Sequence, residues 1–115
     1  MTYVFRGHTA DVRMQVSGGT LEELFADSLK GMTKLMRPVS GKEAVERKVA
    51  LVASDPTSLL IDFLNEALSL SEAERETYDA VAFSKLTETE LHAVLKGYRA
   101  ESFGEHIKAV TYHEA

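Results

Sequence analysis

Apolar and polar residues alternate in several stretches of this chain, and alternation with a period of two is typical of half-buried strands. The clearest example is residues 45–53, where Val45, Val49 and Leu51 alternate with charged or small residues. Two apolar stretches separated only by Thr87, Glu88 and Thr89 have the spacing of a hairpin. The strands that this pattern predicts cover residues 3–6, 12–16, 45–53, 81–86, 90–95 and 107–112.

Two longer stretches repeat apolar residues every three or four positions, which is the period of a helix. The first follows Thr20, and Glu23 stands three residues later, as in a capping box. The second follows Asp55, which can cap, and Pro56 suits a first helical position. The predicted helices begin at residues 21 and 56. The polar stretch 71–79 is expected to be a frayed helix end or loop, and 97–105 a loop.

The order of these elements predicts the fold class. It reads strand, strand, helix, strand, helix, strand, strand, strand, and neighbouring strands with short connections usually pair antiparallel. We therefore expect an α+β fold, an antiparallel sheet sandwich with two helices on one face. A length of 115 residues is that of one domain, so residues 1–115 are expected to form a single unit.

Composition narrows the function classes. The chain has no cysteine, which excludes disulfides, thiolate catalysis and zinc–thiolate sites. Its formal net charge is −5 and its basic residues are dispersed, whereas nucleic-acid binding usually needs a basic face. No apolar run is long enough to span a bilayer, and no signal peptide is recognisable. We expect a cytoplasmic protein that does not bind membranes and meets RNA only through a partner.

Candidate chemistry lies in two short stretches near the ends of the chain. One is His8-Thr9-Ala10-Asp11-Val12, and the other is Lys108-Ala109-Val110-Thr111-Tyr112-His113. Both place polar side chains among residues that otherwise read as buried strand, where an unsatisfied polar group is costly. They suggest one composite site where the two ends of the chain meet.

The residues of these stretches allow two readings. His8, Asp11 and His113 can ligate one ion or form a histidine–carboxylate pair, or the histidines simply satisfy backbone groups at strand ends. An oxygen-rich site without thiolates prefers a hard ion such as Ca²⁺ or Mg²⁺. Asp11 alone is too little for such an ion, and Glu114 is the only acid directly after the last strand. No G-x-S-x-G or phosphate-loop motif is present.

Four segments, taken in order, resemble the archease family. They are residues 8–12, the Gly19-Thr20-Leu21-Glu22-Glu23-Leu24-Phe25 segment, the Asp62-Phe63-Leu64-Asn65-Glu66-Ala67-Leu68 segment and residues 108–113. Each motif alone is modest, but their order and separation span nearly the whole chain. The α+β pattern inferred above agrees with the fold that this resemblance implies.

The resemblance implies a specific activity. Archeases are small cytosolic protein cofactors, not enzymes, of the GTP-dependent RNA ligase that acts in tRNA splicing and RNA repair. They promote guanylylation of the ligase and its return to activity after each turnover. The resemblance also implies a bound divalent ion, with Ca²⁺ preferred over Mg²⁺ or Mn²⁺. One of its ligands maps onto Asp11. Lys108, Thr111 and His113 of the second stretch are further candidates, together with His8 and Glu114.

The chain departs from the family pattern at its end. Family chains continue past the last strand into a further strand that ends in the second acidic ligand, whereas this sequence stops at Ala115. One carboxylate and one strand are therefore expected to be missing, which would leave an exposed sheet edge. Three explanations stay open: a truncated or frameshifted product, a strand supplied by a partner, or replacement of the carboxylate by Glu114. An exposed edge also favours a homodimer.

Two other functions compete with the ligase cofactor. The first is a small divalent-metal-dependent hydrolase that uses His8, Asp11 and His113. The second is a chaperone-like interaction module that binds through its exposed edge strand. Metal-dependent turnover without any partner would distinguish the hydrolase from both of the binding functions.

Overall fold

The part of the chain that the structure describes folds into two helices and six strands. A computed structural model describes the backbone of residues 2–7, 11–15 and 20–112 and the side chains of residues 20–111. The elements follow the order β1 (Thr2–Gly7), β2 (Asp11–Gln15), α1 (Leu21–Met36), β3 (Pro38–Val52), α2 (Pro56–Glu74), β4 (Glu76–Leu86), β5 (Glu90–Phe103) and β6 (Ile107–Tyr112). The predicted α+β class is confirmed.

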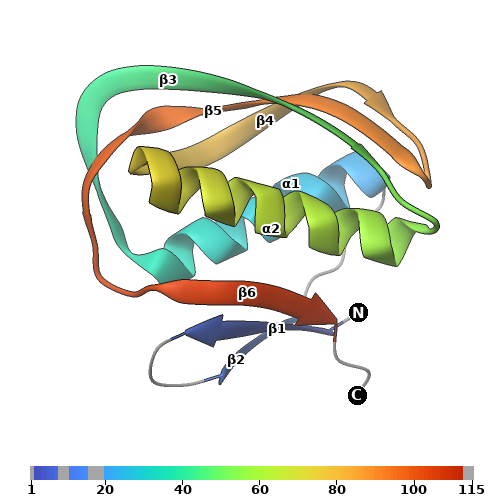
Figure 1. Cartoon of the computed structure of the whole chain (residues 1–115), viewed down its shortest axis with the longest axis horizontal. Coiled ribbons are helices and arrows are strands. Elements are labelled where there is room, and N and C mark those ends of the chain that lie inside the picture. The colour runs from blue at the N-terminus through green and yellow to red at the C-terminus, as the bar shows by residue number, and fades with distance from the viewer. Residues whose placement is uncertain (1, 8–10, 16–19, 113–115) are drawn as a thin grey trace.

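The strands divide between two antiparallel sheets, with the helices between them (Figure 1). One sheet has the order β3–β5–β4 and the other the order β2–β1–β6. Helix α2 contacts strands of both sheets, and α1 packs mainly on β4. The helices therefore lie against strands of both sheets. Neither helix in the described part of the chain has the length and apolar character needed to cross a membrane.

Both helices begin where the sequence predicts. The hydroxyl of Thr20 accepts a hydrogen bond from the backbone N–H of Glu23 at 3.1 Å, and the Asp55 carboxylate accepts one from Ser58 at 2.8 Å. Both helices end at an arginine in the left-handed region, Arg37 (φ 47°) and Arg75 (φ 54°). These caps satisfy backbone groups that a helix end would otherwise leave unpaired.

The core lies between the layers. The rings of Phe25 on α1, Phe63 on α2 and Phe83 on β4 pack with centroids 5.7 to 6.4 Å apart. The buried stripe of α2 is the one that the helical spacing predicts, and its apolar members are Leu59, Leu60, Phe63, Leu64, Ala67 and Leu68. Helical periodicity therefore identified the buried face of α2 correctly.

The irregular stretch predicted at 71–79 is wrong. Helix α2 continues through Glu74, and β4 begins at Glu76 immediately after the cap residue Arg75. Glu76 is fully buried because Arg47 and Tyr78 bind its carboxylate. The acidic run looked like a solvated loop only because its partners lie far away in the sequence.

The loop predicted at 97–105 is also wrong for residues 97–103. Strand β5 continues to Phe103 because β3 starts at Pro38, seven residues before the predicted start, and pairs with β5 along most of its length. Gly97 belongs to this paired region. A Cβ at Gly97 would also overlap the carbonyl oxygen of Thr77 on β4. Glycine at this position marks close approach of two strands and not a turn.

Candidate functional site

The two ends of the chain meet in the smaller sheet. Strand β6, which carries the second polar stretch, pairs antiparallel with β1, and β1 pairs with β2 on its other side. Figure 1 shows β6 lying along helix α2 and beside β1. Residues from the beginning, the middle and the end of the sequence are thereby neighbours.

Backbone register places Asp11 relative to the last strand. Asp11 opens β2 opposite Arg6, and Arg6 is opposite Ala109 on β6. Tyr112, by contrast, is opposite Tyr3, three residues further along. Three residues of strand span roughly 10 Å. The backbone of Asp11 is therefore level with the Lys108–Ala109 end of β6 and not with its carboxyl end.

Half of the candidate site residues lie outside the described residues. These are His8, His113 and Glu114, and the side chain of Asp11 is likewise not described. Among the residues that the structure does describe, no three carboxylate or imidazole side chains lie close enough to hold a metal ion. The ion predicted at Asp11 therefore stays a prediction.

Lys108 lines a hollow of about 390 Å³ at the carboxyl end of α2. Glu72, Arg75 and His106 also line it. The His106 ring lies 6.4 Å from the ring of Phe103, measured between centroids. Lys108 is exposed, so its ammonium group is open to a partner. We call this group of residues, Glu72, Arg75, Phe103, His106, Ile107 and Lys108, the Lys108 hollow.

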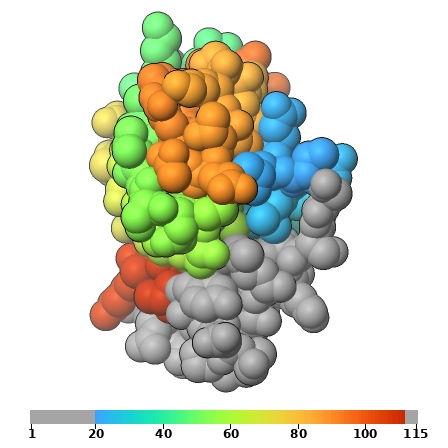
Figure 2. Space-filling model, turned by 90° about the vertical axis from the view of Figure 1, so that its right-hand side faces the viewer, coloured from blue at the N-terminus to red at the C-terminus, as the bar shows by residue number. Residues whose placement is uncertain are grey.

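Thr111 lines a second hollow, of about 470 Å³, at the amino end of α2. We call it the Thr111 hollow, and its lining residues are Asp55, Thr57, Ser58, Ile61, Asp62, Val110 and Thr111. The backbone N–H of Ser58 holds the pKa of the Asp55 carboxyl below its usual value, so this group is ionised at neutral pH. Figure 2 shows the start of α2, in green, against the end of β6, in red. Lys108 and Thr111 thus belong to separate hollows.

Between the two hollows, Asn65 of α2 binds the backbone of β6. Its amide nitrogen donates to the carbonyl of Val110 at 2.9 Å, and its amide oxygen accepts from the N–H of Val110 at 2.7 Å. Asn65 was not among the candidate residues. Its signal was an amide adjoining the buried stripe of α2, inside a segment that resembles the archease pattern.

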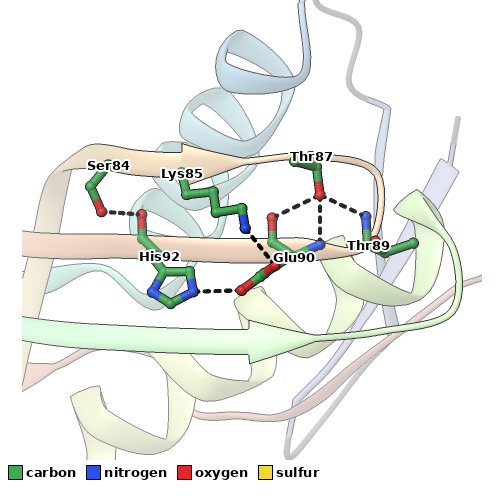
Figure 3. Close-up of polar contacts among 6 residues, drawn as sticks. All are labelled: Ser84, Lys85, Thr87, Thr89, Glu90 and His92. Atoms are coloured by element: carbon green, nitrogen blue, oxygen red, sulfur yellow. Dashed lines mark hydrogen bonds and ion pairs between the residues drawn. The ribbon is translucent and has the colours of Figure 1, made fainter.

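A further polar cluster lies on the β4–β5 hairpin, away from β6 (Figure 3). The Glu90 carboxylate binds Lys85 and His92, each at 2.8 Å. Both hydrogen bonds lower the pKa of Glu90, and the bond from Lys85 has the larger effect. Ser84 donates to the backbone oxygen of His92 and not to its ring. The contacts therefore support the hairpin and do not form a nucleophile–base pair.

Comparison with known proteins gives the family. The model of the Archease protein family matches residues 3–115. The chain belongs to the archease family. Relatives named protein archease include that of Methanosarcina mazei, 34% identical over 97% of this chain and 83% of the relative, and that of Methanosarcina acetivorans, 35% identical over the same shares. The relative in Thermococcus gammatolerans is 33% identical over 93% of this chain and 81% of its own length.

The archease match extends over both hollows. It includes α2 with Asn65 and β6 with Lys108 and Thr111. The resemblance inferred from four short segments is confirmed as membership in the family.

Proposed function

We propose that this archease-family chain is a protein cofactor of a GTP-dependent RNA ligase in tRNA splicing or RNA repair. It promotes guanylylation of the ligase and multiple turnover, and it does not itself catalyse ligation. The observation that carries the proposal is the family match over residues 3–115. The partner is the ligase protein, and RNA is contacted only indirectly.

The charge distribution supports docking on such a partner. The chain has a formal net charge of −5, and α2 exposes Asp62, Glu66 and Glu72 along its length. An enzyme that binds RNA carries basic surface, because phosphate contacts supply much of its affinity. Opposite charges speed the encounter of two proteins and orient them. The exposed side of α2 and the adjoining strand β6 are therefore the proposed docking face.

Lys108 is the residue on this face that is suited to the chemistry of guanylylation. Its ammonium group is exposed beside a hollow, and lysine binds phosphate groups as a compact point charge. In the proposed complex it stabilises negative charge on the phosphates at the ligase active site. This step needs only positioning and electrostatics, which are the main sources of catalysis in phosphoryl transfer.

A ligation assay tests the proposal. Purified ligase is given excess RNA ends with and without this chain, and both guanylylation and the number of turnovers are measured. The wild-type chain is expected to increase both, and Lys108→Ala to lose most of the effect. Lys96→Ala, which removes an exposed lysine from the other sheet, is the matched control and should act like wild type. Unchanged ligase turnover with the wild-type chain would contradict the proposal.

We also propose a divalent ion at Asp11, with Ca²⁺ preferred over Mg²⁺ or Mn²⁺. The donor chemistry fits, since a carboxylate suits hard cations. The described residues do not complete a ligand set, however, so no step above passes through a metal. Calorimetric titration with CaCl₂ is expected to show binding to the wild-type chain and none to Asp11→Asn. Equal heats for the two proteins would remove Asp11 as a ligand.

A further inference from the structure

Strand β6 lies at the edge of its sheet, where backbone groups need partners. Among the described residues the sheet order is β2–β1–β6, so β6 pairs with β1 on one side and with no described strand on the other. An edge strand presents unpaired N–H and C=O groups, which invite pairing with another chain. At Val110, however, both groups are bonded to the side chain of Asn65.

The Asn65 amide takes the place of a neighbouring strand at this point. A strand residue would offer one acceptor and one donor to Val110, and the amide offers both at 2.7 and 2.9 Å. An ionised carboxylate can only accept and an alanine can do neither, so few side chains substitute for it. The expected exposed edge of β6 is therefore closed at Val110.

This contact also sets the position of β6 against α2. Val110 is buried and stands two residues after Lys108 and one before Thr111. The hollows of these two residues are both built between α2 and β6, on either side of the Asn65 contact. A shift of β6 along α2 would displace both side chains at once.

We infer that Asn65 is a positioning residue of the ligase-docking face: its amide closes the edge of β6 and holds Lys108 and Thr111 where a partner can engage them. This inference rests on the proposed function. It assigns to Asn65 no contact with the ligase or with a reacting group.

Hydrogen exchange tests the contact itself. In Asn65→Ala the N–H of Val110 loses its acceptor, and its exchange is expected to be about tenfold faster than in wild type. Amides of the central strand β5, such as that of Leu95, should be unchanged. Ser69→Ala alters an exposed residue four positions further along α2 and serves as the matched control. Unchanged exchange at Val110 in Asn65→Ala would overturn the inference.

A conservative variant adds a pH profile. In Asn65→Asp the ionised carboxylate accepts from Val110 but cannot donate to its carbonyl, whereas the protonated acid can do both. The ratio of Val110 exchange in this variant to that in wild type at the same pH is expected to fall as pH decreases from 7 towards the ordinary aspartate pKa of about 3.9. A ratio that does not change with pH would contradict a paired donor and acceptor.

The ligase assay tests the positioning role. Asn65→Ala is expected to lower stimulation about tenfold, because small misplacements of a positioned group have large kinetic effects. Thr20→Ala removes the cap of the other helix, α1, and controls for reduced stability. If stimulation by Asn65→Ala equals that by Thr20→Ala, the positioning role is wrong. If the wild-type chain does not stimulate the ligase at all, the proposed function fails, and the positioning role fails with it. Faster exchange of the Val110 N–H in Asn65→Ala would still identify Asn65 as the group that closes the edge of β6.

Discussion

The two sheets use polar groups in different ways. Strands β3, β5 and β4 have 15, 14 and 11 residues, and an ion pair with a buried carboxylate joins two of them. Strands β2, β1 and β6 have 5, 6 and 6 residues, and β6 is tied to α2 by the neutral amide of Asn65. The larger sheet therefore has more internal pairing of its own. The smaller sheet carries Lys108 and Thr111 on β6, and β6 takes its position from a neighbouring helix.

The ion pair of the larger sheet illustrates this difference. Two nitrogens of Arg47 on β3 bind the two carboxylate oxygens of Glu76 on β4, at 2.8 and 2.6 Å, and the Tyr78 hydroxyl donates to one of them at 2.7 Å. The Glu76 side chain has no solvent exposure. Two causes raise the pKa of Tyr78: chiefly its burial, and then its hydrogen bond to Glu76. The Tyr78 hydroxyl therefore stays protonated.

Removal of Arg47 should give the largest loss of stability. Arg47→Met keeps the apolar stem but leaves the Glu76 carboxylate buried without a cation, and a buried charge that loses its partner is strongly destabilising. Chemical denaturation should show this loss as a lower midpoint. The ratio of the hydrogen-exchange rate of the Val110 N–H to the rates of neighbouring amides should be the same as in wild type. The reason is that the Asn65 amide, and not Arg47, holds β6 in the smaller sheet. A midpoint within error of wild type would show that water reaches Glu76.

Substitution of Gly97 should have the next largest effect. In Gly97→Ala the new methyl group would overlap the Thr77 carbonyl oxygen, so β4 and β5 must separate locally. Overpacking of this kind costs about 1–3 kcal/mol. Gly104→Ala is a milder comparison, since its Cβ would lie 3.0 Å from the Arg37 side chain. Equal thermal midpoints for the two variants would contradict the close approach at Gly97.

Acid should weaken the same ion pair. The hydrogen bond from Arg47 lowers the pKa of Glu76 below its ordinary value of 4.5. The unfolded chain therefore takes up a proton at higher pH than the folded chain. The contribution of Glu76 to stability is complete above pH 4.5 and is lost as pH falls towards the folded-state pKa. Thermal midpoints measured over this range should fall more steeply for wild type than for Arg47→Met, and parallel curves would exclude Glu76 as the source.

The exposed ion pair of the larger sheet should matter least. Arg99 on β5 binds Glu43 on β3 at 2.7 Å, but both side chains are more than half exposed. Pairs of this kind contribute less than about 1 kcal/mol. Arg99→Met should therefore change the unfolding midpoint far less than Arg47→Met, and high salt should remove most of the difference from wild type. If Arg99→Met lowered the midpoint as much as Arg47→Met, solvent exposure would not explain the difference in stability expected between the two ion pairs.

The successes and failures of the sequence predictions have physical causes. Thr20 and Asp55 cap helices through neighbours only three residues away, so local sequence was enough to place both helix starts. The predictions of irregular structure at 71–79 and 97–105 failed for a common reason. Charged residues, as in the first stretch, and glycine, as at the start of the second, are usual in solvent-exposed loops. Here the charge of Glu76 is neutralised by Arg47 on another strand, and Gly97 is required by a carbonyl on another strand.

Short-range periodicity and motif order were enough to predict the α+β class, the buried stripe of α2, the amino-terminal caps of both helices and the family. The division of the strands into two sheets, the separate hollows of Lys108 and Thr111 and the contact of Asn65 with β6 emerged only from the folded chain. The bond from Asn65 to Val110 joins residues 45 positions apart, and that from Arg47 to Glu76 joins residues 29 apart. Such pairings exist only once the layers have packed, so no local pattern encodes them.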